Sequence, residues 1–334
     1  ELFKEDNRMD VVTEMEDYKR LASFPVPAET WRDWLVDYEI NSRGIAIDTA
    51  LVNGALAIDA EHRDELSRKA VELTGLENPN SRAQLLDWFR EHTDLELTDL
   101  TKATVAGIKT DDATISKLLG IRKELAKSSV TKYTAMTNAL CSDGRVRGLL
   151  QFYGANRTGR WAGRLVQVQN LPRNYIETLD VARDLVKKHN RAGLKMLYGD
   201  VADTLSQLIR TAFIAPEGNM LCVADFSAIE ACVLSWLAQE KWRMDVFATT
   251  GKIYEAAASM MFGVPVESIK KGNPEYALRA KGKIAELALG YGGGPAALAA
   301  MGALNMGLTE DELPNIVRRW RTANRRIVDF WHAV

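Results

Sequence analysis

The sequence predicts an α+β protein, in which a small antiparallel sheet is accompanied by many helices. Apolar residues recur at helical spacing through most of the first 140 residues and again from Ala228 onward. The segment between them is rich in glycine, arginine and short apolar alternations, which favour turns and strands. Two apolar runs also flank "APEGN", a turn signal, and predict a β-hairpin.

The first elements are helices. Residues 1–26 predict a short helix that ends before Pro25 and Pro27, and residues 31–40 predict a second helix. In "SRGIAIDTALVNGALAI" a turn and a short extended piece precede a helix whose N-cap is Asp48 or Thr49. Residues 56–74 and 113–140 predict long amphipathic helices, with a loop and a capped helix between them in "NPNSRAQLLDWFREH".

The later elements alternate between strands and helices. Residues 221–224, "LCVA", predict the end of a buried strand, and the helical pattern resumes at Ala228. From Tyr254 to Val334 the pattern is mostly helical, with breaks at "FGVP", "GNP", "GGGP" and "ELP".

Composition places few limits on the function. Hydrophobic residues make up 46% and charged residues 26% of the 334-residue chain, which is ordinary for a globular protein. No apolar run approaches the roughly 18 residues of a membrane span, so no membrane partner is expected. Cys222 and Cys232 lie in apolar stretches and predict buried free thiols, as in a cytoplasmic protein. The opening "ELFKEDNRMD" resembles no signal peptide and lacks an initiator Met, so we expect the chain to begin within a longer protein.

Charge is unevenly distributed although the formal net charge is only −2. Between Gly144 and Arg173 there is no Asp or Glu, which indicates a local anion site. A basic loop that binds nothing in particular is the alternative. The window holds six arginines: Arg145, Arg147, Arg157, Arg160, Arg164 and Arg173.

Two further segments could bind phosphates. In "YALRAKGKIAELALGYGGGP", Arg279 and Lys283 lie four residues apart on one helical face, where they could hold a phosphate chain or form an ordinary solvated basic face. In "TGRWAGRLVQVQNLPR", glycines next to Arg160 and Arg164 allow close approach to the backbone. The arginines, with Gln169 and Asn170, suit phosphates and minor-groove acceptors, unless the arginines pair with acids elsewhere in the fold.

Asp225 ends the apolar run of residues 221–224. A buried carboxylate without a partner costs several kcal/mol, so Asp225 is expected to face a cation. An aspartate at a strand end, near cations on a helix, suits Mg²⁺ bound to a triphosphate. An N-cap for a helix that begins near Ser227 is the alternative.

These segments resemble family A DNA polymerases, especially those of bacteriophages. "LAKSSVTKYTA", "TGRWAGRLVQVQNLP", "VADFSAIE" and "RAKGKIAELALGYGG" occur in the order, and nearly at the spacing, of that family's motifs. The resemblance implies a right-hand architecture of thumb helices, a partial antiparallel palm sheet and helical fingers. It assigns 1–27 to a remnant of an exonuclease-like domain or linker. It further assigns 28–140 to the N-terminal polymerase region and thumb, 141–240 to part of the palm, and 241–334 to the fingers.

The resemblance also implies roles for the site residues. Asp225 would bind two Mg²⁺ ions that act with a dNTP, and the backbone carbonyl of Phe226 would be a further ligand. Glu230 would be a steric gate that excludes a 2′-OH. Arg279 and Lys283 would bind the incoming triphosphate, with Lys283 placed to donate a proton to the leaving pyrophosphate.

Other roles concern the template, the nucleotide and the DNA backbone. Tyr291 would stack near the templating base, and Tyr254 stands where many relatives have a His that contacts the triphosphate. Leu287 stands where relatives carry Phe or Tyr and influences acceptance of dideoxynucleotides. The DNA-binding residues implied for primer–template DNA are Arg160, Arg164, Gln169, Asn170, Ser128, Ser129 and Lys132.

The sequence departs from the family pattern in three places. No His is followed by Asp, although the family's last palm motif is a His-Asp dipeptide whose Asp is the second shared metal ligand. Cys232 stands where the family usually has Arg. In "KEDNRMDVVTE", which resembles the closing helix of a proofreading exonuclease, Asp6 replaces the expected Tyr four residues before Asp10, so no exonuclease activity is expected.

We therefore expect a DNA-directed DNA polymerase that is inactive or very weak as this chain alone. A second polypeptide or a C-terminal segment would supply the other metal-binding Asp, because two adjacent metal ions need more than one bridging carboxylate. The alternatives are a catalytically incomplete module that grips primer–template DNA, and a nucleotide-binding protein unrelated to templates.

Overall fold

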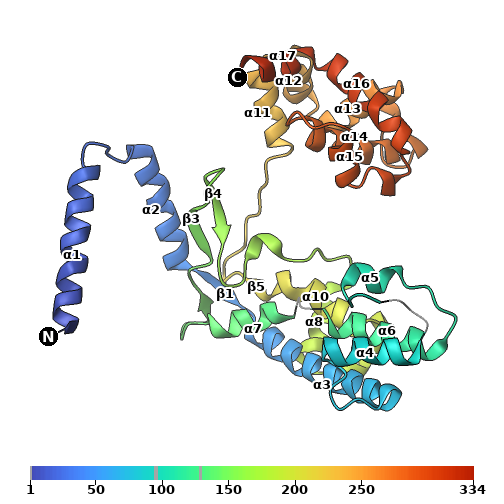
Figure 1. The fold of residues 1–334 in the computed structure, drawn as a ribbon. Coiled ribbons are helices and arrows are strands. Elements are labelled where there is room, and N and C mark those ends of the chain that lie inside the picture. The colour runs from blue at the N-terminus through green and yellow to red at the C-terminus, as the bar shows by residue number, and fades with distance from the viewer. Residues whose placement is uncertain (1, 94–96, 128–129) are drawn as a thin grey trace. The chain divides into compact units, whose positions relative to one another are not determined.

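The computed structural model describes residues 2–93, 97–127 and 130–334. It divides into two compact units, Glu1–Leu221 and Cys222–Val334, which are treated separately below. Helices dominate both units, and short antiparallel strands lie in the first (Figure 1). The predicted α+β class is thus confirmed. The predicted boundaries near 27, 140 and 240 stay predictions.

The first unit begins with α1 (Leu2–Leu21) and α2 (Ala28–Arg43), close to the predicted helices. The long helix α3 (Thr49–Thr74) follows, and its N-cap is Asp48, one of the two predicted candidates. An Asp48 carboxylate oxygen accepts a hydrogen bond of 3.1 Å from the backbone N–H of Leu51. This bond satisfies one of the backbone donors left free at a helix start.

Four shorter helices come next: α4 (Arg82–His92), α5 (Lys102–Gly107), α6 (Ala113–Leu125) and α7 (Thr131–Asn138). The prediction of one helix over 113–140 is wrong, because α6 ends at Leu125. The Arg63 guanidinium explains this end: it donates to the carbonyl oxygens of Leu125 and Lys127 at 3.1 and 2.8 Å. Those carbonyls are bound by a side chain rather than by the next helical turn.

The first unit holds two small sheets. Strands β2 (Arg145–Val146), β1 (Ile45–Ile47) and β5 (Phe213–Ile214) form one antiparallel sheet in that order. Strands β3 (Leu150–Ala155) and β4 (Arg160–Gly163) form a hairpin. The predicted hairpin around "APEGN" is wrong, because β5 pairs with β1 and residues 219–226 form no strand. Without a partner strand these residues are solvated, and Val223 is 90% exposed.

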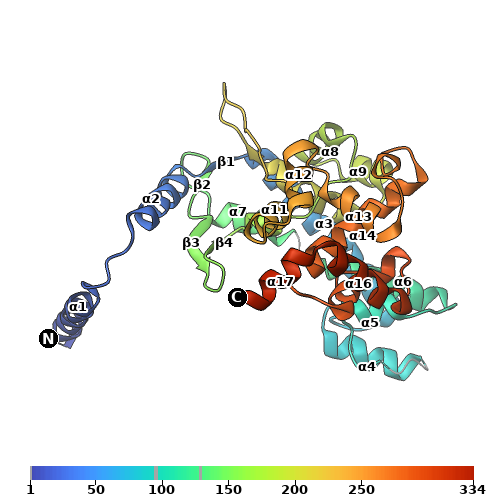
Figure 2. The same cartoon turned by 90° about the horizontal axis from the view of Figure 1, so that it is seen from above.

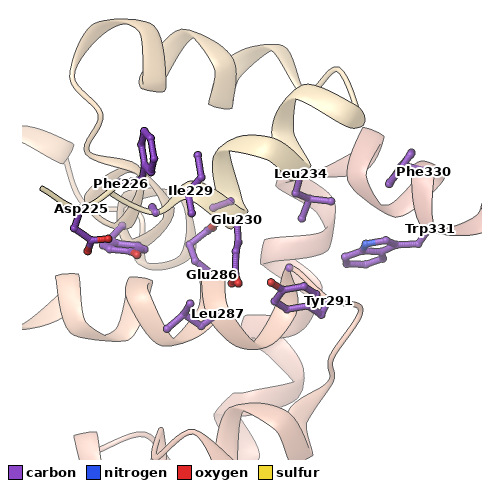
Figure 3. A pocket seen from close by; sticks show the side chains of 14 residues that line it. Asp225, Phe226, Ile229, Glu230, Leu234, Glu286, Leu287, Tyr291, Phe330 and Trp331 are labelled. Atoms are coloured by element: carbon purple, nitrogen blue, oxygen red, sulfur yellow. The ribbon is translucent and has the colours of Figure 1, made fainter. Parts of the chain in front are cut away.

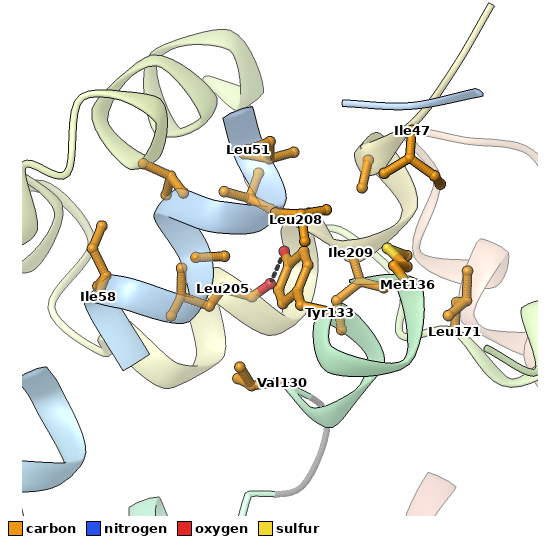
Figure 4. Packing of buried hydrophobic residues seen from close by; sticks show 14 of the residues in the cluster. Ile47, Leu51, Ile58, Val130, Tyr133, Met136, Leu171, Leu205, Leu208 and Ile209 are labelled. Carbon is orange, nitrogen blue, oxygen red and sulfur yellow. Dashed lines mark hydrogen bonds between the residues drawn. The ribbon is translucent and has the colours of Figure 1, made fainter. Parts of the chain in front are cut away.

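The main core of the first unit lies between α3, α7 and three further helices: α8 (Leu179–Lys187), α9 (Arg191–Tyr198) and α10 (Val201–Leu208). Tyr133 is fully buried at its centre, and its hydroxyl donates to the carbonyl oxygen of Leu205 at 2.8 Å (Figure 4). Burial raises the pKa of Tyr133, so the phenol stays neutral. Gly54 permits the close contact of α3 with α8, since a Cβ there would lie 2.1 Å from the carbonyl oxygen of Val186.

The second unit consists of helices (Figure 2). They pack around buried residues that include Leu289, Trp320 and Ile327. They are α11 (Ile229–Leu237), α12 (Lys241–Thr249), α13 (Ile253–Phe262), α14 (Leu278–Leu289), α15 (Pro295–Ala300), α16 (Leu313–Ala323) and α17 (Arg325–Ala333). The four predicted breaks fall between these helices or, for "ELP", at the first turn of α16.

Short 3-10 turns complete both units: Val168–Asn170, Ile209–Ala212, Val266–Ser268, Pro274–Ala277, Leu304–Met306 and Glu310–Glu312. Among the described residues, no helix combines the length and the apolar character needed to cross a membrane. The prediction that Cys222 is buried is wrong, because it lies in the solvated stretch 219–226, and Cys232 is only half-buried.

Candidate functional site

The second unit contains a pocket of about 520 Å³. Six of the predicted site residues line it: Asp225, Phe226, Glu230, Tyr254, Leu287 and Tyr291. They come from the stretch before α11, from α11 itself, and from α13, α14 and the turn after α14 (Figure 3). The lining residues that the sequence pattern missed include Glu286, Phe330 and Trp331.

Asp225 and Phe226 lie at the edge of this pocket on exposed backbone that leads into α11. The expectation that Asp225 is buried is therefore wrong, as is the N-cap alternative. The N-cap of α11 is Ala228, and no side chain caps the helix. An exposed carboxylate can be reached by a cation from solvent. Among the described residues, no three His, Cys, Asp or Glu side chains form a metal-binding group.

Glu230 lies in the first turn of α11 and points into the pocket. Its side chain and that of Tyr291 point toward each other, and Leu287 lies beside them on α14 (Figure 3). Leu287 and Tyr291 are four residues apart, so successive helical turns carry them to the same side of the pocket. A ligand in this pocket would meet a carboxylate, a phenol and an aliphatic side chain.

Arg279 and Lys283 lie on α14 but do not line the pocket. Arg279 donates from Nε to the Glu255 carboxylate at 2.9 Å, and its guanidinium lies 5.5 Å from the centroid of the Tyr254 ring. The i+4 spacing of Arg279 and Lys283 did not reveal Glu255, because this acid lies on a different helix, α13. Lys283, one turn farther along α14, is half-buried. Arg279 and Lys283 thus lie on one face of α14, and Arg279 already forms an ion pair with Glu255.

Tyr254 is tied to the same helix by the backbone as well. Gly282 on α14 faces α13 so closely that a Cβ there would lie 2.1 Å from the Tyr254 carbonyl oxygen. Burial and the carboxylates of Glu286, Glu230 and Glu255 raise the pKa of Tyr254. The phenol therefore stays protonated at neutral pH and can act as a hydrogen-bond donor.

A buried polar network lies behind the pocket. The side chains of Arg243 and Glu286 are 0% and 1% exposed, and they form a two-bond ion pair, one bond of which measures 2.9 Å. Arg243 also donates to Ser235 Oγ and Asn324 Oδ1 at 2.8 and 2.9 Å. Trp320 Nε1 donates to Glu286 at 2.8 Å. The network joins α11, α12, α14 and α16 and so fixes the helix that carries Glu230 against the helix that carries Leu287.

The predicted DNA-binding residues of the first unit lie around the β3–β4 hairpin and the turn Val168–Asn170. Arg160, Arg164, Gln169 and Asn170 are exposed. Gly163 lets the Gln169 side chain come close, because a Cβ on it would lie 2.2 Å from the side-chain oxygen of Gln169. The glycines of this segment were predicted to let another group approach the backbone closely. At Gly163 the group that approaches is the side-chain amide of Gln169.

Arg145 and Arg147 of the acid-free window contact backbone carbonyls of residues 42–44. Arg145 donates to the carbonyl oxygens of Arg43 and Gly44 at 2.7 and 2.8 Å. Arg147 donates to the Ser42 carbonyl and to both carboxylate oxygens of Asp143. The basic surface of the window is consequently smaller than the sequence indicates, and its exposed members are Arg157, Arg160, Arg164 and Arg173.

The remaining predicted residues belong to the segment "LAKSSVTKYTA". Lys132 is half-buried, and its Nζ donates to the carbonyl oxygen of Val166 at 2.7 Å. Ser128 and Ser129 lie outside the described residues. A phosphate contact for all three stays a prediction.

Sequence reasoning missed a second basic site, a pocket of about 400 Å³ in the first unit. Arg63, Arg82 and Arg122 line it, with Ser67 and Asn80. The Arg122 Nε is buried and has no hydrogen-bond partner among the described residues. Burial and the charge of Arg82 lower the pKa of Arg122. A bound anion would offset both effects. No sequence signal marks the site, because its residues come from three separate helices and loops.

The family model for DNA polymerase family A matches residues 56–334. The chain is 55% identical, over its whole length, to a DNA polymerase of Bacillus phage SP02, and it covers 51% of that protein. It is also 44% identical over 69 residues to the thermostable DNA polymerase I of Thermus aquaticus, across 21% of this chain and 8% of that protein. The chain thus spans about half the length of its phage relative.

The solved structures include a similar fold. The polymerase domain of Pol1 from M. smegmatis, in complex with DNA primer–template and dNTP, aligns with a TM-score of 0.55 at 21% sequence identity. The alignment covers 87% of this chain and 46% of that one. This similarity confirms the predicted fold class, α+β with the right-hand polymerase architecture.

Proposed function

Because the chain belongs to DNA polymerase family A, we propose that it performs template-directed DNA synthesis, in which a nucleotidyl group passes from a dNTP to a primer 3′-OH. One observation carries this proposal. The pocket of the second unit gathers Asp225, Glu230, Tyr254, Leu287 and Tyr291 from separate elements around a space of about 520 Å³. In that arrangement Asp225 offers a carboxylate for a metal ion, Glu230 could act as the steric gate for the sugar, and the Tyr291 ring could stack on a base.

The residues at the pocket edge fit Mg²⁺. Asp225 is exposed and offers carboxylate oxygens, and the backbone carbonyl of Phe226 follows it; oxygen atoms are the ligands that this ion prefers. When bound, two Mg²⁺ ions would activate the 3′-OH and stabilise the leaving oxygen. Asp225 and Phe226 would hold the ions at the edge of the pocket.

The triphosphate would lie along α14. Lys283 carries a compact charge suited to a phosphate oxygen and could donate a proton to the leaving pyrophosphate. Arg279, held by Glu255 at 2.9 Å, keeps other guanidinium nitrogens for the triphosphate. Tyr254, kept neutral by its surroundings, could donate a hydrogen bond where many relatives have a His. Tyr291 would stack near the templating base.

Glu230 would select deoxyribose by occupying the space that a 2′-OH needs. In the Glu230→Ala variant the preference for dNTP over rNTP is expected to fall by about 10- to 200-fold, the range for one extra group in a pocket. Single-nucleotide insertion kinetics with matched dNTP and rNTP measure this ratio. The exposed Glu267→Ala variant, whose residue lies outside the pocket, is the control. An unchanged preference for dNTP over rNTP in Glu230→Ala would show that Glu230 does not act as the steric gate.

The first unit would hold primer–template DNA. The exposed Arg160, Arg164, Gln169 and Asn170 suit contacts to the minor groove and phosphates. The basic pocket of Arg63, Arg82 and Arg122 suits one backbone phosphate. Contacts from Ser128, Ser129 and Lys132 would strengthen the binding of primer–template DNA.

We further propose that the second metal-binding Asp comes from residues outside this chain's 334. Two Mg²⁺ ions repel each other, and Asp225 alone offsets little of that repulsion. A second polypeptide or C-terminal segment that carries a His-Asp motif would supply the missing carboxylate.

Primer extension by the chain, with and without a C-terminal fragment that carries a His-Asp motif, tests the proposed function. Extension is expected to be very weak for the chain alone and to rise by at least about a hundredfold when the fragment binds, because a shared metal ligand is restored. A folded complex that binds primer–template DNA and still fails to extend it would identify the chain as a catalytically incomplete DNA-binding module.

A further inference from the structure

Glu255 of α13 is a mostly buried acid beside the residues proposed to bind the triphosphate. Its side chain is only 12% exposed. Among the described residues, its one ionic partner is Arg279 of α14, whose Nε donates to Glu255 Oε1 at 2.9 Å. A carboxylate that is removed from water is costly unless a cation pairs with it. The bond to Arg279 therefore favours one position for both side chains.

Two further features restrict the Arg279 side chain. Its guanidinium lies 5.5 Å from the centroid of the Tyr254 ring, within the range of a cation–π interaction. Gly282 lets α13 and α14 approach each other closely, which keeps Tyr254 and Glu255 beside Arg279. The Arg279 side chain is nevertheless 38% exposed. The guanidinium is thus fixed on the side that faces α13 and accessible to a ligand elsewhere.

The bond from Nε determines which donors of Arg279 a ligand can use. A guanidinium can bind an oxyanion through Nε and one Nη atom, or through its two Nη atoms. Glu255 occupies Nε, and no other hydrogen bond engages this guanidinium in the part of the chain that the structure describes. The edge formed by Nη1 and Nη2 is left for a ligand, and it can donate two parallel bonds to a phosphate.

Lys283, the other cation on this face of α14, has different requirements. Its ammonium is a point charge whose donors rotate, so it can meet a phosphate oxygen from many directions. A guanidinium is planar and binds a phosphate well only in a matching orientation. Across residues 2–93, 97–127 and 130–334, no carboxylate lies within 4.0 Å of Lys283 Nζ, whereas Arg279 has Glu255. The acid thus pairs with the cation whose orientation matters.

We infer that Glu255 is a positioning residue, which orients the guanidinium of Arg279 so that its Nη1–Nη2 edge meets the triphosphate of a dNTP. The inference rests on the proposed function, since it takes the triphosphate to lie along α14. Glu255 acts through Arg279 rather than by touching the nucleotide. It has two opposite effects on affinity, because the orientation of Arg279 favours the triphosphate while the charge of Glu255 itself repels it.

Two substitutions at Glu255 separate these effects. Glu255→Gln removes the charge and keeps a side-chain oxygen that can accept a hydrogen bond from Arg279 Nε, whereas Glu255→Ala removes both. Equilibrium dialysis of the chain against radiolabelled dATP in Mg²⁺ gives the Kd of each variant without a need for catalysis. Glu255→Ala is expected to bind dATP about 2- to 10-fold more weakly than Glu255→Gln, the usual cost of immobilising one long side chain on binding.

A double-mutant comparison tests whether this difference passes through the guanidinium. Methionine has no N–H donor, so R279M/E255Q and R279M/E255A should bind dATP with the same affinity. Glu267, exposed and outside the pocket, supplies the control, and Glu267→Gln and Glu267→Ala should both bind dATP as the native chain does.

The outcomes distinguish the inference from the function on which it rests. Equal affinities of Glu255→Gln and Glu255→Ala for dATP, with normal binding by the native chain, would overturn the inference alone. A difference that persists in the Arg279→Met background would also overturn it, because Glu255 would then act by another route. A native chain that binds no dATP would overturn the proposed function together with the inference.

A second measurement uses the native chain and needs no Glu255 variant to fold. NMR of the chain with ¹⁵N-labelled arginine detects Nε–H groups, and the Arg279 signal is the one that Arg279→Met removes. A charge-assisted bond to Glu255 should slow the exchange of this proton with water. The exchange should stay slow after dATP and Mg²⁺ are added. Loss of this protection on binding would show that Arg279 leaves Glu255 to meet the triphosphate, and would overturn the inference.

Discussion

Replacement of Asp225 by alanine is expected to lower the rate of primer extension by about a thousandfold or more. Loss of a ligand shared by two metal ions removes several kcal/mol of transition-state stabilisation, and each 1.4 kcal/mol corresponds to a factor of ten. The measurement is single-turnover extension in Mg²⁺, with the His-Asp fragment present so that the native chain is active.

DNA binding separates this role from a structural one. Asp225 is exposed and lies on extended backbone before α11, so its removal should leave folding and the affinity for primer–template DNA nearly unchanged. Asp245→Ala, which removes an exposed acid from α12 away from the pocket, is the control and should extend primers normally. A normal extension rate in Asp225→Ala would mean that the metal ions are held by other groups.

The Arg243→Met variant is expected to lose about 3–5 kcal/mol in its free energy of unfolding, the usual effect of removing one partner of a buried ion pair. Among the described residues, the substitution would leave the fully buried Glu286 carboxylate with Trp320 as its hydrogen-bond donor. It would also leave Ser235 and Asn324 without the guanidinium that they contact. Urea unfolding measures the loss, and hydrogen exchange should assign it to α11, α12, α14 and α16.

Two further variants sharpen this prediction. The double variant R243M/E286M replaces both charges with apolar side chains and should be less destabilised than Arg243→Met, because no buried charge is left unpaired. Arg326→Met removes an exposed arginine and should change the free energy of unfolding by no more than about 0.5 kcal/mol. A double variant that is less stable than Arg243→Met would show that the ion pair is not the dominant contribution.

The sequence predicts most of the helices because they depend on local spacing, and it predicts much of the pocket through the resemblance of its motifs to those of family A DNA polymerases. Asp48 and Ser81 cap the helices that follow them, as the residue types indicate. Leu287 and Tyr291 reach the same pocket because they are four residues apart on α14 and its C-terminal turn. Helix caps and the positions of residues four apart on a helix depend on one segment alone, so they can be predicted without knowing which other elements pack against it.

The errors arise where a segment depends on a distant partner. Residues 221–224 have the composition of a buried strand, but a strand is buried only if another strand or helix covers it, and β5 pairs with β1 instead. Arg279 appeared as one of two unopposed cations because Glu255 lies on another helix. Arg243 and Glu286, 43 residues apart, appear in the sequence as ordinary surface charges. Their burial is set by four helices that no local pattern brings together.

Gly282 limits which changes to this pocket evolution or an engineer can make. A side chain there would have to displace the Tyr254 carbonyl, 2.1 Å from the position of its Cβ, and would push α13 away from α14. Tyr254 and Glu255 would then separate from Arg279, so even alanine would alter the side of the pocket that is proposed to bind the triphosphate. Leu287, half-buried and directed into open space, carries no such constraint. Libraries for modified nucleotides should therefore randomise position 287 and keep glycine at 282.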